Sequence, residues 1–134
     1  MSRDRPFLIK TNKKLYKILT SEKKLLADTL TPVSIYLKIR DKFSNSLLLE
    51  SSDYGANDNS FAYVCFNPIA HISVKENIIS KSFPGGVKET IEINKNIDVV
   101  KQVDEFCKLF ECKKNDKKFI NNGVFGYMNY DSIK

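Results

Sequence analysis

The polar side chains that follow the apolar run Leu47–Leu49 are the residues best suited to bind a small charged molecule. A strand with one covered face would alternate apolar with polar residues, so this unbroken run predicts a strand over residues 47–51 that is buried on both faces. At its end, the Glu50 carboxylate can accept a hydrogen bond from an ammonium group, and the Ser51 hydroxyl can donate one to a carboxylate. The pair could therefore hold a small zwitterion. Strands also commonly end in polar turn residues, and that interpretation stays open beside the first.

Residue types that support catalysis occur elsewhere in the chain without the spacing that catalysis needs. His71 is the only histidine, is predicted to lie in the middle of a strand, and has no partner by motif. None of the serine-hydrolase, zinc-protease or phosphate-loop motifs is present. Glu89 and Glu92 are predicted to point to opposite faces of one strand, so they cannot act as a carboxylate pair. We expect no catalytic residue in these 134 positions.

The length and composition predict one globular domain over residues 1–134. A hydrophobic content of 42% and an aromatic content of 11% exclude a disordered chain, and a chain of this length buries about two thirds of its unfolded surface. No apolar run approaches the roughly 20 residues needed to cross a bilayer, and the first residues lack the apolar segment of a signal peptide. We therefore expect a cytoplasmic protein with no membrane partner.

The cysteines and lysines do not form recognisable sites. Cys65, Cys107 and Cys112 show neither the even count of a disulfide framework nor paired zinc-ligand spacing, and they are predicted to be reduced, mostly buried thiols. The net charge is +6, yet most lysines are scattered among acidic residues. One group follows a predicted helix and is interpreted as a solvated turn: Lys113, Lys114, Lys117 and Lys118.

Two aromatic runs, over residues 61–66 and 125–130, could in principle stack the bases of single-stranded nucleic acid. Phe and Tyr in strands are more often core residues, and the Lys/Arg-Gly-Phe pattern of an RNA-binding strand is missing. No nucleic-acid partner is predicted.

The surrounding elements predict an α+β fold, in which a largely antiparallel meander of strands carries two main helices packed on it. Thr31 and Pro32 form the start of a helix that extends to about Lys42. Asn96 is predicted to cap a second helix from Ile97 to about Lys113, whose apolar stripe places Phe106 in the core. Strands are predicted over residues 47–51, 61–66, 69–75, 78–83, 87–93 and 124–130, with short strand-like pieces over 7–19 and a turn at Pro84-Gly85-Gly86.

Four ordered stretches resemble the N-terminal region of anthranilate synthase component I, the larger subunit of the enzyme that opens the tryptophan branch. They are Asp-Thr-Leu-Thr-Pro-Val-Ser-Ile-Tyr-Leu-Lys (28–38), Leu-Leu-Leu-Glu-Ser (47–51), Phe-Ala-Tyr-Val-Cys-Phe-Asn-Pro-Ile-Ala-His-Ile (61–72) and Gly-Val-Phe-Gly-Tyr-Met-Asn-Tyr-Asp (123–131). The resemblance extends from about Leu15 to Asp131 and implies part of the β-sandwich architecture of that family.

The resemblance implies a regulatory role for the Leu-Leu-Glu-Ser segment, which in the family lines a feedback pocket for L-tryptophan. It makes Leu49, Glu50 and Ser51 ligand-binding residues, with Phe61 or Tyr63 as the apolar wall for the indole ring. The chain departs from the family at residues 60–63, where Ser-Phe-Ala-Tyr replaces an Arg-Tyr-Ser-Phe-like run and a basic residue near the pocket is missing.

The resemblance also implies a larger parent protein. In the family, the residues that bind chorismate and Mg²⁺ belong to a C-terminal part that these 134 residues do not include, so the chain is expected to be inactive alone. The parent would convert chorismate and ammonia to anthranilate and pyruvate, with the ammonia supplied by a glutamine amidotransferase, component II. Two alternatives stay open: the N-terminal domain of aminodeoxychorismate synthase component I, and a free-standing module that binds a small ligand or nucleic acid.

Overall fold

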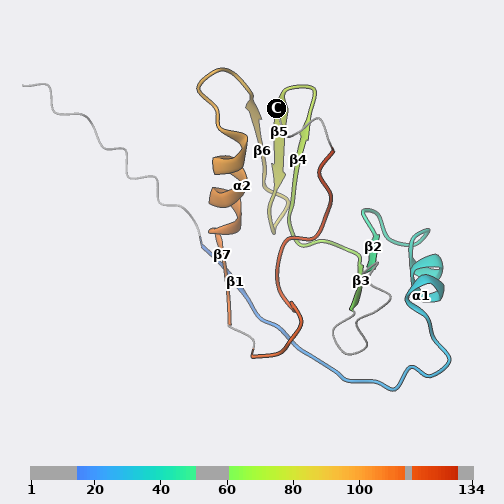
Figure 1. Cartoon of the computed structure of the whole chain (residues 1–134). Helices are drawn as coiled ribbons and strands as arrows, with labels where there is room; N and C mark the ends of the chain where they lie inside the picture. Colours follow the sequence, from blue (N-terminus) through green and yellow to red (C-terminus); the bar gives the residue numbers. More distant parts are fainter. Residues whose placement is uncertain (1–14, 51–60, 114–115, 130–134) are drawn as a thin grey trace, which may run out of the picture.

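The chain adopts an α+β fold of two helices and three small sheets, as seen in a computed structural model that describes residues 15–50, 61–113 and 116–129 (Figure 1). The predicted α+β fold class is confirmed, and so is the prediction that most strands pair antiparallel. The elements in chain order are β1 (Tyr16–Ile18), α1 (Pro32–Ile39), β2 (Leu47–Glu50), β3 (Ala62–Cys65), β4 (His71–Lys75), β5 (Ile78–Ser82), β6 (Lys88–Glu92), α2 (Val99–Cys107) and β7 (Phe110–Cys112).

The strands do not form the one continuous meander that the sequence predicts. β2 pairs with β3, β4–β5–β6 form a separate antiparallel sheet, and β1 pairs in parallel with β7 from the other end of the described chain. The break between β3 and β4 falls at Asn67 and Pro68. Asn67 has a positive φ of 50°, and Pro68 has no N–H to donate to a ladder, so strand pairing stops there.

The core lies between the β4–β5–β6 sheet and α2. On the central strand, Ile79 is fully buried, and Phe83 follows on the same face. Phe106 of α2 is 3% exposed, and its ring lies 5.5 Å from that of Phe83 and 5.3 Å from that of Phe110. Such tilted and edge-on aromatic contacts are favourable beyond the area they bury. The predicted core position of Phe106 is confirmed.

Helix α1 begins where the sequence predicts and ends earlier. Thr31 and Ser34 form a reciprocal capping box with Pro32 at the first helical turn. The helix ends at Ile39 and does not continue to Lys42 as predicted, because the N–H groups of Lys42 and Phe43 both donate to the Ile39 carbonyl and tighten the chain into a turn. α1 lies against β2 and β3.

Helix α2 is shorter at both ends than the prediction of residues 97–113. Its N-cap is Asp98, whose carboxylate accepts a hydrogen bond from the Lys101 N–H at 3.1 Å, and not Asn96. The helix ends at Cys107, and Phe110 belongs to β7, where its ring stacks on Tyr16 at 5.4 Å. Pairing with a distant strand therefore overrides the helical periodicity of the local sequence.

Several burial predictions are wrong. Leu47, Leu48 and Leu49 are half-buried, because β2 and β3 are the two strands that the described residues contribute to this sheet, and a pair of strands cannot enclose both of its faces. Cys107 and Cys112 are exposed and Cys65 is half-buried, so the thiols are not mostly buried.

The predicted strand over residues 124–130 is also wrong for its described part. Residues 124–129 form no strand, and Tyr127 is 87% and Met128 80% exposed. The turn at Pro84-Gly85-Gly86 is confirmed, since Gly85 and Gly86 have φ angles of 84° and 79° that favour glycine.

Some predictions fall outside the described residues. They are the polar start over residues 1–6, the part of the predicted strand-like pieces that falls on residues 7–14, the loop over 53–59, and Ser51. In the described ranges, neither helix has the length and apolar character needed to cross a bilayer.

Candidate functional site

The candidate site is built on the β2–β3 pair. Its register places Leu49 opposite Tyr63 and Glu50 opposite Ala62. Directly opposed residues of an antiparallel pair share a face, and successive residues alternate between faces. Leu49 and Tyr63 therefore lie on one face of the pair, and the exposed Glu50 lies on the other.

The face that carries Leu49 and Tyr63 is covered by aromatic residues from the end of the described chain. The Tyr63 ring lies 5.2 Å from that of Phe125, and the Phe61 ring lies 6.0 Å from that of Phe119. The Tyr63 hydroxyl also accepts a hydrogen bond from the Ile120 N–H at 3.1 Å. Residues 119–125 thus lie across β3 and form an aromatic wall, defined here as Phe61, Tyr63, Phe119 and Phe125.

Polar contacts hold this covering segment in place. The Glu22 carboxylate accepts hydrogen bonds from Lys117 and from the Asn121 side chain, the latter at 2.7 Å. The Asn122 amide donates to the Thr20 hydroxyl at 2.8 Å. These contacts join two non-helical segments that are about 100 positions apart in the chain, and they explain how the covering segment is positioned without belonging to a sheet.

The structure brings together only part of the set predicted from the sequence. Leu49 is half-buried on the face of the aromatic wall, and Phe61 is a half-buried member of the wall. Glu50 is exposed on the opposite face, and Ser51 lies outside the described residues. The alternative apolar neighbour, Tyr63, is the cross-strand partner of Leu49. The contacts of Phe119 and Phe125 with Phe61 and Tyr63 were not predicted from the sequence. Their aromatic character is the one signal that could have indicated them, because no local pattern predicts a contact between residues some 60 positions apart.

One ionisable group beside the wall, the Cys65 thiol of β3, has a shifted pKa. Burial raises the pKa of the Cys65 thiol above its usual value, which keeps it in the protonated, weakly nucleophilic form. No group of three or more His, Cys, Asp or Glu side chains among the described residues is arranged to hold a metal ion. The side chains of the wall are aromatic, so the surface that it presents is suited to contact with apolar or aromatic groups.

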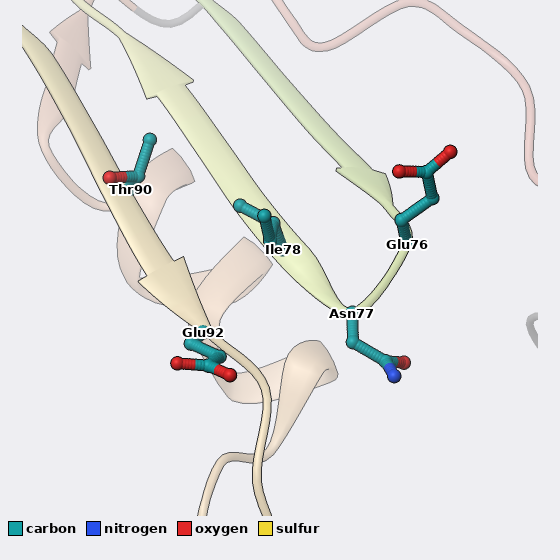
Figure 2. A pocket seen from close by; sticks show the side chains of 5 residues that line it. All are labelled: Glu76, Asn77, Ile78, Thr90 and Glu92. Carbon is teal, nitrogen blue, oxygen red and sulfur yellow. The ribbon is translucent and has the colours of Figure 1, made fainter.

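A separate hollow of about 360 Å³ lies at the β4–β5 turn (Figure 2). Glu76, Asn77 and Ile78 line it together with Thr90 and Glu92 of β6. The figure shows Glu76 at the turn and Glu92 at the end of β6, with their carboxylates pointing away from each other. They do not converge on a common ligand, so this hollow is not a second candidate site.

The chain therefore has an α+β fold, with an aromatic wall beside the β2–β3 pair as its candidate site. Comparison with known proteins found two relatives, each an anthranilate synthase component 1. The protein from Lactococcus lactis subsp. lactis (strain IL1403) is 36% identical over 58 residues, which cover 43% of this chain and 12% of the relative. The protein from Aquifex aeolicus (strain VF5) is 26% identical over 123 residues, which cover 89% of this chain and 24% of the relative.

These matches are partial. The matched regions span about an eighth and a quarter of the two relatives. The similarity therefore supports a relation between this chain and one portion of an anthranilate synthase component 1, and through it a link to tryptophan biosynthesis. No family model matches the chain, and no solved structure matches it.

Proposed function

We propose that this chain is the N-terminal, regulatory portion of an anthranilate synthase component I, and that its β2–β3 pair contributes to a feedback pocket for L-tryptophan. The parent reaction converts chorismate, with ammonia from glutamine, to anthranilate and pyruvate. The observation that carries the proposal is the similarity to two component 1 proteins, one of which aligns over 89% of this chain.

The aromatic wall supports the tryptophan part of the proposal. An indole ring needs a flat apolar surface, and aromatic rings stack or meet edge to face at centroid separations of about 4.5–7 Å. Phe119 and Phe125 cover Phe61 and Tyr63, so the indole ring would bind at the margin of this aromatic wall, beside Leu49. Ser51, which follows β2, would bind the carboxylate group of the amino acid. Glu50 lies on the opposite face of the pair, so the ammonium group would reach it only around the end of the strand.

The described residues do not provide a site for the Mg²⁺ ion of the parent reaction, because no group of potential ligands converges among them. We therefore assign Mg²⁺ and chorismate to a C-terminal part of the subunit and derive no catalytic step for this chain. In this proposal, that C-terminal part and a glutamine amidotransferase component II are its protein partners in the cytoplasm.

Feedback inhibition tests the proposal in a subunit that carries this region ahead of a chorismate-binding part. Ser51→Ala removes one hydrogen bond to the ligand, so the tryptophan concentration for half inhibition should rise roughly two- to tenfold while turnover without tryptophan is unchanged. Ser73→Ala on β4 is the matched control and should leave inhibition as it is. Unchanged inhibition in Ser51→Ala would contradict the assigned pocket.

A further inference from the structure

Strand β1 has an outer edge that no described strand occupies. β1 pairs only with β7 in the described ranges, and the Tyr16 N–H donates to the Leu109 carbonyl at 2.8 Å. In a parallel pair, successive residues direct their N–H and C=O groups to alternate sides. The backbone groups of Tyr16 and Ile18 therefore point toward β7, and those of Lys17 point to the opposite, outer edge.

A groove of about 400 Å³ lies against β1. Five consecutive residues line it, namely Leu15 to Leu19, together with Ile69, Pro84 and Phe110. Consecutive residues of a strand alternate between faces, so a hollow that all five line extends from the face that Tyr16 shares with Phe110 to the backbone of β1. Leu19 is 96% exposed and Leu15 and Ile69 about 60%. The groove is therefore apolar, open, and placed where an added strand would lie.

The floor of the groove is fixed to the core. The Tyr16 ring stacks on Phe83 at 5.8 Å and on Phe110 at 5.4 Å, and Phe83 is buried against α2. β1 lies next to β7 just beyond the end of α2 (Figure 1). An incoming segment would thus meet a strand that already holds its shape, which lowers the ordering cost of binding.

The positive charge of Lys17 determines which kind of polypeptide segment can pair with the outer edge of β1. Lys17 is the exposed middle residue of β1, and it makes no ion pair with any residue that the structure describes. If a second copy paired antiparallel about the centre of β1, the two Lys17 side chains would lie directly opposite each other, and like charges in that position are destabilising. The net charge of +6 also disfavours self-association and attracts acidic partners.

We propose that the outer edge of β1 binds an extended segment of another polypeptide, which adds as a further strand and carries a carboxylate side chain opposite Lys17 with apolar side chains on either side of it. The backbone of Lys17 supplies the hydrogen bonds, and the groove receives the apolar side chains. This site is distinct from the proposed tryptophan pocket and does not depend on it.

The test uses two fluorescein-labelled peptides, acetyl-Thr-Val-Glu-Val-Thr-amide and the same peptide with Lys at its centre. Fluorescence polarisation with the full chain should show that the Glu peptide binds more tightly, by roughly two- to fivefold for one cross-strand charge pair. Lys17→Pro should abolish binding of both peptides, because it removes an outward N–H that makes no bond to β7. Lys23→Pro, in an exposed segment without regular structure, is the control and should bind as the unmodified chain does.

A charge reversal keeps the test decisive if the proline variant does not fold. Lys17→Glu retains the backbone N–H and should reverse the preference in favour of the Lys peptide. Absence of binding to both peptides would overturn the proposal. Binding that is unaffected by Lys17→Pro in a folded variant, or a dimer in sedimentation experiments that Lys17→Pro dissociates, would overturn it as well, because the edge would then be unused or occupied by a second copy.

Discussion

Lys81 lies on the central strand β5 between two core residues, Ile79 and Phe83, and is 6% exposed. Its ammonium group donates to the Gln102 side-chain carbonyl of α2 at 2.8 Å. A buried charge is costly, and one neutral amide offsets only part of the lost hydration. We therefore expect an apolar side chain at this position to strengthen the packing of α2 on the sheet.

Lys81→Met is expected to raise the free energy of unfolding by about 1–2 kcal/mol, because it keeps the length of the side chain and removes the buried charge. Urea denaturation followed by circular dichroism measures the change. The control is Lys101→Met on the exposed surface of α2, which should stay within about 0.5 kcal/mol of the unmodified chain. A loss of stability in Lys81→Met would show that the contact with Gln102 is net favourable.

Phe106→Ala should destabilise the chain by about 3–5 kcal/mol, since it opens a cavity where three phenylalanine rings meet. Val100→Ala, on the same helix but at a position that is 78% exposed, should cost far less. The same urea titration compares the two variants. A cost below about 1 kcal/mol for Phe106→Ala would mean that the residue is not in the core.

The three thiols should differ in reactivity. Burial raises the pKa of Cys65, so at mildly alkaline pH it has a smaller thiolate fraction than an ordinary cysteine, and it is also less accessible. Cys107 and Cys112 are exposed and should react with a disulfide reagent first. Mass spectrometry of partly labelled protein would identify the order. Faster labelling of Cys65 would contradict the described burial.

At the level of elements, β4 and β5 pair along their whole length, but the turn that joins them contains a residue type that disfavours the backbone conformation found there. Lys75 pairs with Ile78, and the two residues between them, Glu76 and Asn77, have φ angles of 48° and 62°. Positive φ at both positions is typical of a two-residue hairpin turn that prefers Asn-Gly, and a side chain such as that of Glu is strained there.

Replacing the pair by Asn-Gly, as Glu76→Asn with Asn77→Gly, should stabilise the chain by about 1 kcal/mol. Thermal unfolding measures the gain. Changing Glu76 to Gln retains the strain and serves as the control, with no gain expected. Equal melting temperatures for the double variant and the unmodified chain would show that this turn does not limit stability.

Local signals predicted most of the elements correctly. The Thr31 and Pro32 start of α1 and the glycine turn before β6 follow from side-chain hydrogen bonding and φ preference, which neighbouring residues decide. The errors occur where distant contacts decide. Phe110 continues the helical spacing of α2 but pairs with Tyr16 in a parallel ladder. Residues 124–129 have the composition of a strand but lie outside any sheet, with Phe125 against Tyr63.

The candidate site was only partly predictable for the same reason. The position of Leu49 and Glu50 on β2 and of Tyr63 on β3 follows from strand patterning, and the register of the two strands agrees with it. Phe61 lies one residue before β3. Phe119, Ile120 and Phe125 reach Phe61 and Tyr63 through folding of the whole chain, and no local spacing specifies that contact.

For the whole molecule, the main structural feature is the contrast between one small core and much exposed apolar surface. The buried side chains among the described residues gather at the β4–β5–β6 sheet and α2. Leu25, Leu26 and Val124 are each at least 60% exposed. This distribution is consistent with a chain that aligns with about a quarter of a longer relative.

The most direct test of the tryptophan pocket is ligand binding by the chain itself, which contains no tryptophan, so that all indole fluorescence comes from the added amino acid. The fluorescence anisotropy of L-tryptophan should rise and saturate as the chain is added. The rise should be weaker with Ser51→Ala and unchanged with Ser73→Ala. If the anisotropy of L-tryptophan stays flat while that of a labelled oligonucleotide rises with a steep salt dependence, the chain is a nucleic-acid-binding module and the proposed pocket is contradicted.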